Sequence, residues 1–198
     1  MKPCSVVVCG VGGQGVLLLA RTLAEAAFIE GLDVVQSEIH GLAQRGGAVV
    51  AHVRFGSRVH SPLVDPYKAD LLLSLEALEA LRNRVYAGRK TSVVCNMLIL
   101  PPPSAAAMRM KIPKLDEIKE AFAHAKLFKY VEAQRIAGEK GLPQGANMVV
   151  LGFSFGLGLL PLSEKGLLEA IKTVVPDRYI EKNIELFNVG RKVAESRK

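Results

Sequence analysis

The chain has 198 residues, of which 49% are hydrophobic and 23% are charged, and this balance excludes an intrinsically disordered protein. Lysine and arginine number 26 against 19 aspartate and glutamate residues, which gives a net charge of +7, and only 6% of the residues are aromatic. The basic residues are scattered and form no helix with interleaved aromatic side chains, so nucleic-acid binding is not favoured. A positive surface facing an anionic cofactor or an acidic partner subunit accounts for the charge equally well.

The length and the hydropathy pattern indicate one compact unit, and we expect a single domain over residues 1–198. The most apolar stretch, residues 148–162, is interrupted by glycines and by Pro161, and it is shorter than the ~20 residues that a bilayer requires. The N-terminus carries one lysine before a β-branched run, which predicts a strand and not a signal peptide. We therefore expect a cytoplasmic protein without a membrane contact.

Three cysteines, Cys4, Cys9 and Cys95, are too few for the usual four-cysteine ligation of an iron–sulfur cluster, and they form no C-x-x-C pair. We interpret them as small buried residues in a reducing compartment. The chain is therefore predicted to hold no metal, and any redox metal must lie on another chain.

The first elements predict a Rossmann-like α/β fold. Residues 5–9 form a continuous apolar run, typical of a central parallel strand. A glycine-rich turn at 10–15 leads into a helix at 16–30, which Gly31 ends. A second strand at 33–36 completes a βαβ unit, which is the opening of a doubly wound sheet.

The following segment departs from that pattern. Residues 37–47 have no apolar period and predict a polar loop. Residues 48–55 predict a strand, and residues 58–60 a possible return strand after a turn. This antiparallel hairpin would make the sheet mixed.

The rest of the chain predicts three more strands and a helical C-terminal segment. The strands are expected at 70–75, 91–96 and 127–131, and the helices at 75–83, 116–124, 133–140, 147–160, 164–174 and 178–195. Prolines make 98–113 an extended connection. The helix at 147–160 is apolar on every side, so it must be buried against other helices or against a partner.

The glycine turn carries the first candidate site. Gly10, Gly12 and Gly15 have the G-x-G-x-x-G spacing between a strand and a helix, where backbone amides and the helix N-terminus can bind a phosphate. A dinucleotide site also needs an acid at the end of the second strand, and Glu38 comes slightly late for it. A dinucleotide site, an anion pocket and a tight structural turn all remain open, and Gly13 and Gln14 belong to the same candidate.

The polar loop is the second candidate, because it follows the second strand and so lies at the edge where open α/β sheets bind ligands. Its candidate residues are Glu38, His40, Gln44, Arg45, Gly46 and Gly47. This mixture suits catalysis or anion binding, but it also suits a solvated connection. No nucleophile–base–acid arrangement is evident, so no catalytic residue is assigned.

These two segments together resemble a known family. The turn at 10–16 followed by Ser-Glu-Ile-His-Gly-Leu-Ala-Gln-Arg-Gly-Gly at 37–47 is similar to the paired signature of the pyruvate/2-oxoacid ferredoxin oxidoreductase gamma family. The His-Gly-x-x-Gln-Arg-Gly-Gly form is most similar to the beta subunit of indolepyruvate ferredoxin oxidoreductase. Residues 143–152 and 176–190 resemble later blocks of the family, so the resemblance spans nearly the whole chain.

The resemblance implies a division of labour between subunits. In the family, a 2-oxoacid loses CO₂ on thiamine diphosphate, CoA takes the acyl group, and electrons leave through iron–sulfur clusters to ferredoxin. The thiamine diphosphate and the clusters belong to a large alpha subunit, and the small chain helps to form the substrate and CoA region. The implied function of this chain is that of the small subunit, inactive alone, with aryl pyruvates as the default substrates.

Two other function classes stay open. The glycine turn also suits a free-standing NAD(P)- or flavin-binding reductase, and an empty turn suits an interaction module. Cofactor absorbance of the purified chain separates the reductase from the others, and co-purification with a large thiamine and iron–sulfur protein separates the subunit from the module.

Overall fold

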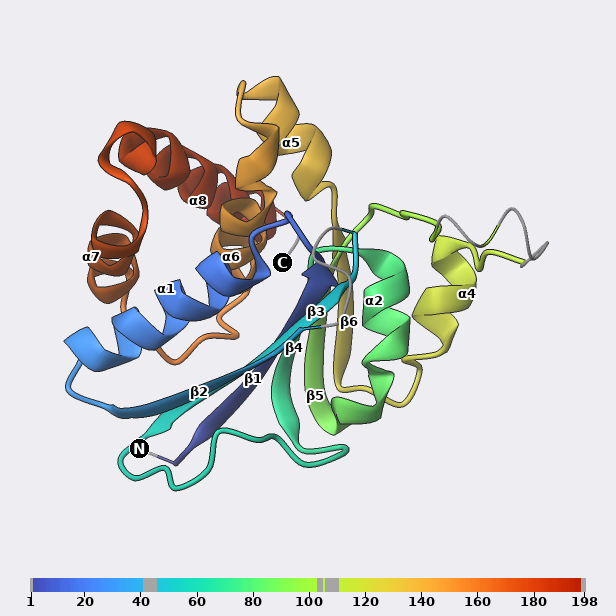
Figure 1. Cartoon of the computed structure of the whole chain (residues 1–198), viewed down its shortest axis with the longest axis horizontal. Coiled ribbons are helices and arrows are strands. Elements are labelled where there is room, and N and C mark those ends of the chain that lie inside the picture. Colours follow the sequence, from blue (N-terminus) through green and yellow to red (C-terminus); the bar gives the residue numbers. More distant parts are fainter. Residues whose placement is uncertain (1, 41–45, 103–104, 106–110, 197–198) are drawn as a thin grey trace.

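The architecture is a mixed six-stranded sheet between two helical layers (Figure 1), which confirms the predicted α/β class with its helical C-terminal segment. The computed structural model describes residues 2–40, 46–102, 105 and 111–196. The strands are β1 (Cys4–Val11), β2 (Asp33–His40), β3 (Ala48–Gly56), β4 (Ala69–Ser74), β5 (Ala87–Asn96) and β6 (Leu127–Val131). The helices are α1 (Val16–Ile29), α2 (Ala77–Arg82), α4 (Leu115–Glu120), α5 (Ala133–Glu139), α6 (Ala146–Gly156), α7 (Glu164–Val174) and α8 (Ile180–Glu195), with short 3₁₀ turns η1 (Arg84–Tyr86), η2 (Pro143–Gly145) and η3 (Asp177–Tyr179). In the part of the chain so described, no helix has the length and apolar character needed to cross a membrane.

The strand order is β2-β3-β1-β4-β5-β6. The strands β1, β4, β5 and β6 are parallel to one another, while β3 pairs antiparallel with both β1 and β2. The central strand β1 is buried along nearly its whole length, as its unbroken apolar run predicts.

The pairing of β3 corrects two predictions. We expected its antiparallel partner at residues 58–60, but these form no strand, and β3 lies instead between β1 and β2. The loop predicted at 37–47 is also too long, because β2 continues to His40. Pairing with β3 holds this polar extension, from Ser37↔His52 to His40↔Val49, and ladder hydrogen bonds do not require an apolar sequence.

The alternating side chains of the central strands form two cores. Val6, Val8 and Leu73 face the layer of α1, α6, α7 and α8. Val7 and Cys9 face the other layer, which contains α2 and α4. Helix α1 follows β1 onto the first face and α2 follows β4 onto the second, so the chain changes face between these neighbouring strands.

The apolar helix α6 is internal to this chain. Its residues from Ala146 to Ser154 are all buried, and it packs against α8 and α1. The sequence left open whether other helices or a partner cover this segment, and the structure assigns the covering to other helices. The backbones of α6 and α8 approach closely at Gly152, where an added Cβ would lie 1.9 Å from the carbonyl oxygen of Phe187.

We therefore expect Gly152→Ala to lower the free energy of unfolding by about 1–3 kcal/mol, because the methyl group would push α8 away from α6. The control is Gly138→Ala in α5, where an added Cβ meets no atom within 4 Å. This change should stabilise the chain by about 0.5–1 kcal/mol, through helix propensity alone. Urea denaturation of both variants measures the difference, and equal midpoints would contradict the close packing.

Candidate functional site

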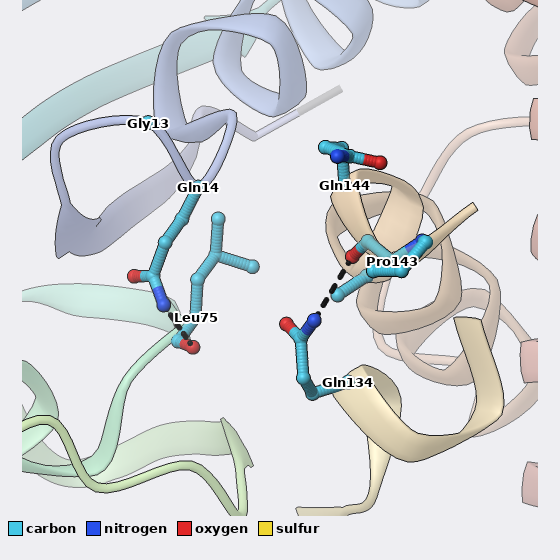
Figure 2. A pocket seen from close by; sticks show the side chains of 7 residues that line it. Gly13, Gln14, Leu75, Gln134, Pro143 and Gln144 are labelled. Carbon is cyan, nitrogen blue, oxygen red and sulfur yellow. Dashed lines mark hydrogen bonds between the residues drawn. The ribbon is translucent and has the colours of Figure 1, made fainter. Parts of the chain in front are cut away.

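The candidate site lies where β1 and β4 end side by side. Because the helices after these two strands leave toward opposite faces, a crevice opens between the strand ends, which is the usual ligand position in open α/β sheets. The glycine turn borders the crevice on one side, and η2 with the starts of α5 and α6 borders it on the other (Figure 2).

Two glycines of the turn have backbone angles that other residues rarely adopt. Gly13 has φ 98° and Gly15 has φ 80°, both in the left-handed region. Gly10 has no room for a side chain, since an added Cβ would lie 2.8 Å from Oε1 of Gln14 and 2.9 Å from a methyl group of Val16. Two of the three glycines in the spacing noted in the sequence, Gly10 and Gly15, are therefore required by the local structure, whether or not a ligand binds.

The side chain of Gln14 closes the turn. Its Oε1 accepts a hydrogen bond from the Val11 amide at 2.7 Å, and its Nε2 donates to the carbonyl oxygen of Leu75 at 3.3 Å. Leu75 follows β4, so this one side chain joins the end of β1 to the end of β4 (Figure 2). Gln14 belongs to the predicted site residues, and the structure gives it this positioning role.

A second contact holds the turn from the helical layer. The buried Asn147, at the start of α6, donates from Nδ2 to the carbonyl oxygen of Gly15 at 3.2 Å. An added Cβ on Gly15 would lie 2.4 Å from that nitrogen. The start of α1 is thereby fixed against the start of α6.

The backbone amides at the N-terminus of α1 are available to bind an anion. No side chain caps it, and it follows the left-handed Gly15 directly. A hollow lies over this helix end, lined by Val11, Gly12, Gly13, Gly15, Val16, Leu17 and Val49. Uncapped amides at a helix N-terminus attract an anion, so a phosphate group fits here.

The polar segment 37–47, the second candidate of the sequence, meets the glycine turn at one of its ends. The amide of Gly12 donates to the carbonyl oxygen of Gly47 at 2.8 Å, and Gly46 has φ 72°. Gln44 and Arg45 lie outside the described residues, so their roles stay predictions. The hydrogen bond to Gly47 places the end of the polar segment 37–47 beside the glycine turn.

Glu38 and His40 lie on β2 and not in a loop. The carboxylate of Glu38 accepts a hydrogen bond from Gln36 Nε2 at 2.8 Å and lies 3.8 Å from Nε of Arg21 on α1. Strand β3 separates β2 from β1, so Glu38 does not lie beside the glycine turn on a neighbouring strand, as an acid that binds the ribose of a dinucleotide would.

A second hollow, of about 180 Å³, occupies the crevice itself. Its lining includes three glutamine side chains and no charged group: Gly13, Gln14, Leu75, Gln134, Pro143, Gln144 and Ala146. Gln134 donates to the carbonyl oxygen of Pro143 at 3.2 Å, whereas Gln144 is exposed (Figure 2). Such a lining suits an uncharged polar group, for example an amide.

The sequence reasoning did not single out Gln134 or Asn147 as site residues. Gln144 and Asn147 lie in the stretch 143–152 that resembles the family, which was the available signal. Gln134 carries no local signal, because only the fold brings the start of α5 to the crevice.

The cysteines are buried thiols, as expected. Burial raises the pKa of Cys4 and of Cys9 to about 12, which keeps both protonated and unreactive at neutral pH. Among the described residues, no three His, Cys, Asp or Glu side chains are grouped as a metal site would require.

Comparison with known proteins covers nearly the whole chain. A family model described as pyruvate ferredoxin/flavodoxin oxidoreductase matches residues 5–193. The indolepyruvate oxidoreductase subunit IorB of Archaeoglobus fulgidus is 38% identical over 187 residues, covering 94% of this chain and 92% of that protein. The IorB subunit of Thermococcus kodakarensis is 36% identical over 197 residues, covering 98% of each protein. The 2-oxoglutarate synthase subunit KorC of Methanothermobacter marburgensis is 32% identical over 192 residues, covering 94% of each.

Solved structures share the fold. The gamma subunit of a keto/oxoacid ferredoxin oxidoreductase from Geobacter sulfurreducens superimposes with a TM-score of 0.71 at 22% identity, covering 98% of this chain and 99% of that one. The 2-oxoglutarate:ferredoxin oxidoreductase of Magnetococcus marinus, solved with 2-oxoglutarate, coenzyme A and succinyl-CoA bound, gives 0.75 at 20% identity, covering 99% of this chain and 32% of that one.

We expect Gln14→Ala to lower the free energy of unfolding by about 1–3 kcal/mol, because the Val11 amide would lose its acceptor inside the turn. Gln144→Ala removes the same side chain from the other wall of the same hollow. This control should change stability by at most about 0.5 kcal/mol, since Gln144 is exposed. Chemical denaturation of both variants tests the difference, and similar losses would refute the role given to Gln14.

Proposed function

Because the chain belongs to the pyruvate ferredoxin/flavodoxin oxidoreductase family, we propose that it is the small subunit of an enzyme complex that oxidises aryl pyruvates of the indolepyruvate type with ferredoxin as electron acceptor. The supporting observation is the full-length similarity to IorB subunits at 36–38% identity. The 2-oxoglutarate synthase relative is less similar, at 32% identity, which favours the aryl pyruvate over 2-oxoglutarate.

The proposed partner is a large alpha subunit that carries thiamine diphosphate and iron–sulfur clusters. The residues of this chain do not fit an iron–sulfur cluster. The buried thiols, whose pKa is raised, are unsuited to a cluster, and the described residues contain no grouped metal ligands. No step of the reaction is therefore assigned to a side chain of this subunit.

Two features of the crevice support a role for this chain in binding coenzyme A. The uncapped N-terminus of α1 at Gly15 and Val16 can hold a phosphate, and the adjoining hollow lined by Gln14, Gln134 and Gln144 can hold an amide. When bound, CoA supplies the thiol that accepts the acyl group. The task of this chain is then to bind and orient the coenzyme beside the active site of the large subunit.

The alternative is a free-standing NAD(P)- or flavin-dependent reductase. The described structure disfavours it, because Glu38 is paired with Arg21 and Gln36 on a strand that does not adjoin β1. We expect the isolated chain to be colourless and to show no NAD or FAD binding at micromolar concentration. Isothermal titration and an absorbance spectrum measure this, and tight binding of either cofactor would promote the reductase.

The proposal is tested by co-expression with a large subunit of the family from the same genome. The purified pair should reduce ferredoxin with indolepyruvate and CoA, and should turn over 2-oxoglutarate much more slowly. The large subunit alone and the small subunit alone should both be inactive. Failure of the two chains to co-purify, or full activity of the large subunit alone, would overturn the proposal.

The CoA role predicts a specific effect of Gly13→Ala. A methyl group at this exposed position on the rim of both hollows should raise the KM for CoA about tenfold or more while the two subunits still associate. The control is Gly31→Ala, which also replaces a glycine of positive φ, 71° against 98° at Gly13, at the far end of α1. Equal KM values in steady-state assays of the two variant complexes would remove CoA from the crevice.

A further inference from the structure

The amino ends of the parallel strands form a second surface feature, at the edge of the sheet opposite the crevice. Three segments meet there: the turn before β4, the turn η1 with the start of β5, and the residue before β6. These segments carry one exposed tyrosine, Tyr67, and five exposed cations, and we call the group the basic end: Lys68, Arg84, Arg89, Lys90 and Lys126. The starts of β4 and β5 are visible at the bottom of Figure 1.

Backbone hydrogen bonds hold these segments side by side. The amide of Tyr67 donates to the carbonyl oxygen of Val85 at 2.8 Å, and the amide of Lys126 donates to that of Thr91 at 3.0 Å. An added Cβ on Gly88 would lie 2.2 Å from the carbonyl oxygen of Tyr67. The basic end is thus a fixed surface made from three parts of the sequence.

Tyr67 has an unusual backbone. It is the one non-glycine residue with a positive φ, 62°, in the described part of the chain. The amide of Lys68 donates to the carbonyl oxygen of Asp65 at 3.1 Å, and Pro66 precedes Tyr67. This is the arrangement of a type II turn, in which glycine is preferred at the position that Tyr67 occupies.

The side chain of Tyr67 makes little buried contact that would offset the backbone strain. Its side chain is exposed, with 63% of the residue surface accessible, and Val85 beside it is 40% accessible. A non-glycine residue in the left-handed region is retained where surrounding contacts enforce it, and such strain is concentrated at functional sites. Exposed tyrosine and arginine side chains are also the types that contribute most to protein interfaces.

The charge of the basic end is unbalanced. Within the described residues, no carboxylate lies within 4 Å of the nitrogen atoms of its five cations, whereas Arg135, Lys182 and Arg191 elsewhere all form ion pairs. The acidic groups nearby in the sequence are Asp65 and Asp70, and Asp70 accepts a hydrogen bond from the Ser5 amide at 2.8 Å. The surface therefore attracts a negatively charged partner.

We propose that the basic end docks on an acidic surface of the large subunit, with the Tyr67 ring inserted at the centre of the contact. This inference rests on the proposed function, which supplies the large subunit as partner. A second copy of this chain that docked through the same face would present the same positive charge and be repelled. One exposed tyrosine beside an apolar Val85 suits a protein interface better than a nucleic acid, which would need several stacking side chains.

The first test is Tyr67→Gly. If Tyr67 serves the fold, this change lowers the melting temperature; if it serves docking, the melting temperature stays equal or rises because the turn is relieved of strain. We expect the second result, together with an association with the large subunit that is about tenfold weaker or more in a titration followed by light scattering. Unchanged affinity would overturn the inference.

The second test reverses charge with a matched control. Arg89→Glu with Lys90→Glu changes the net charge by the same amount as Lys165→Glu with Lys192→Glu on α7 and α8, where both lysines are exposed. The first pair should weaken association and reduce its salt dependence, and the control pair should not. Equal behaviour of the two pairs overturns the docking surface, whereas a wild-type chain that never binds the large subunit overturns the proposed function instead.

A labelled oligonucleotide provides the remaining outcome. The result that refutes docking has two parts. The substitutions at Arg89 and Lys90 would abolish oligonucleotide binding, and they would leave the association with the large subunit unchanged. The basic end would then be assigned to nucleic acid. We expect oligonucleotide binding that is weak and equal in both charge-reversed pairs.

Discussion

The candidate site depends on the hydrogen bonds that join the ends of β1 and β4 through Leu75. The amide of Leu75 donates to the carbonyl oxygen of Cys9 at 2.9 Å, and its carbonyl oxygen accepts from Gln14 and from Asn96. One backbone position thus ties together the glycine turn, β1, β4 and β5. Since the flanking helices leave toward opposite faces at this place, the same bonds that fix the turn also define the wall of the crevice.

These hydrogen bonds distinguish the residues that hold the glycine turn in place from the backbone groups that are available to a ligand. Gln14, Gly10 and Asn147 hold the backbone and are occupied by intramolecular contacts. Gly13 and the uncapped start of α1 remain directed outward. A turn built in this way is pre-organised, so an anion that binds it does not have to order the loop.

The insertion of β3 distinguishes this chain from a dinucleotide-binding domain that has the same glycine spacing. In such a domain the first two parallel strands adjoin, and the acid of the second lies beside the turn. Here an antiparallel strand separates them, and Val49 of β3 lines the hollow at the glycine turn. The opposite edge of the sheet carries the unbalanced positive charge, so the two ends of the same strands offer distinct surfaces, one suited to a small anionic ligand and one to an acidic protein.

The sequence by itself determined the elements whose cause is local. The strand β6 and the helix α7 were predicted at their observed bounds, 127–131 and 164–174, because apolar periodicity and the flanking breakers fix them. The glycine positions of the turn and the buried cysteines were likewise predictable from residue type and spacing. The motifs also carried the resemblance to the family, which the comparisons confirmed.

Only the tertiary structure decided what depends on pairing between distant segments. The partner of β3, the extension of β2 to His40 and the burial of α6 within this chain could not be predicted, because ladder hydrogen bonds and helix packing join residues far apart in sequence without a local signal. For the same reason, only the structure identified Gln134 and Asn147 as residues near the crevice. The basic end could not be recognised in the sequence either, because its five cations come from three separate segments that meet only where the parallel strands begin.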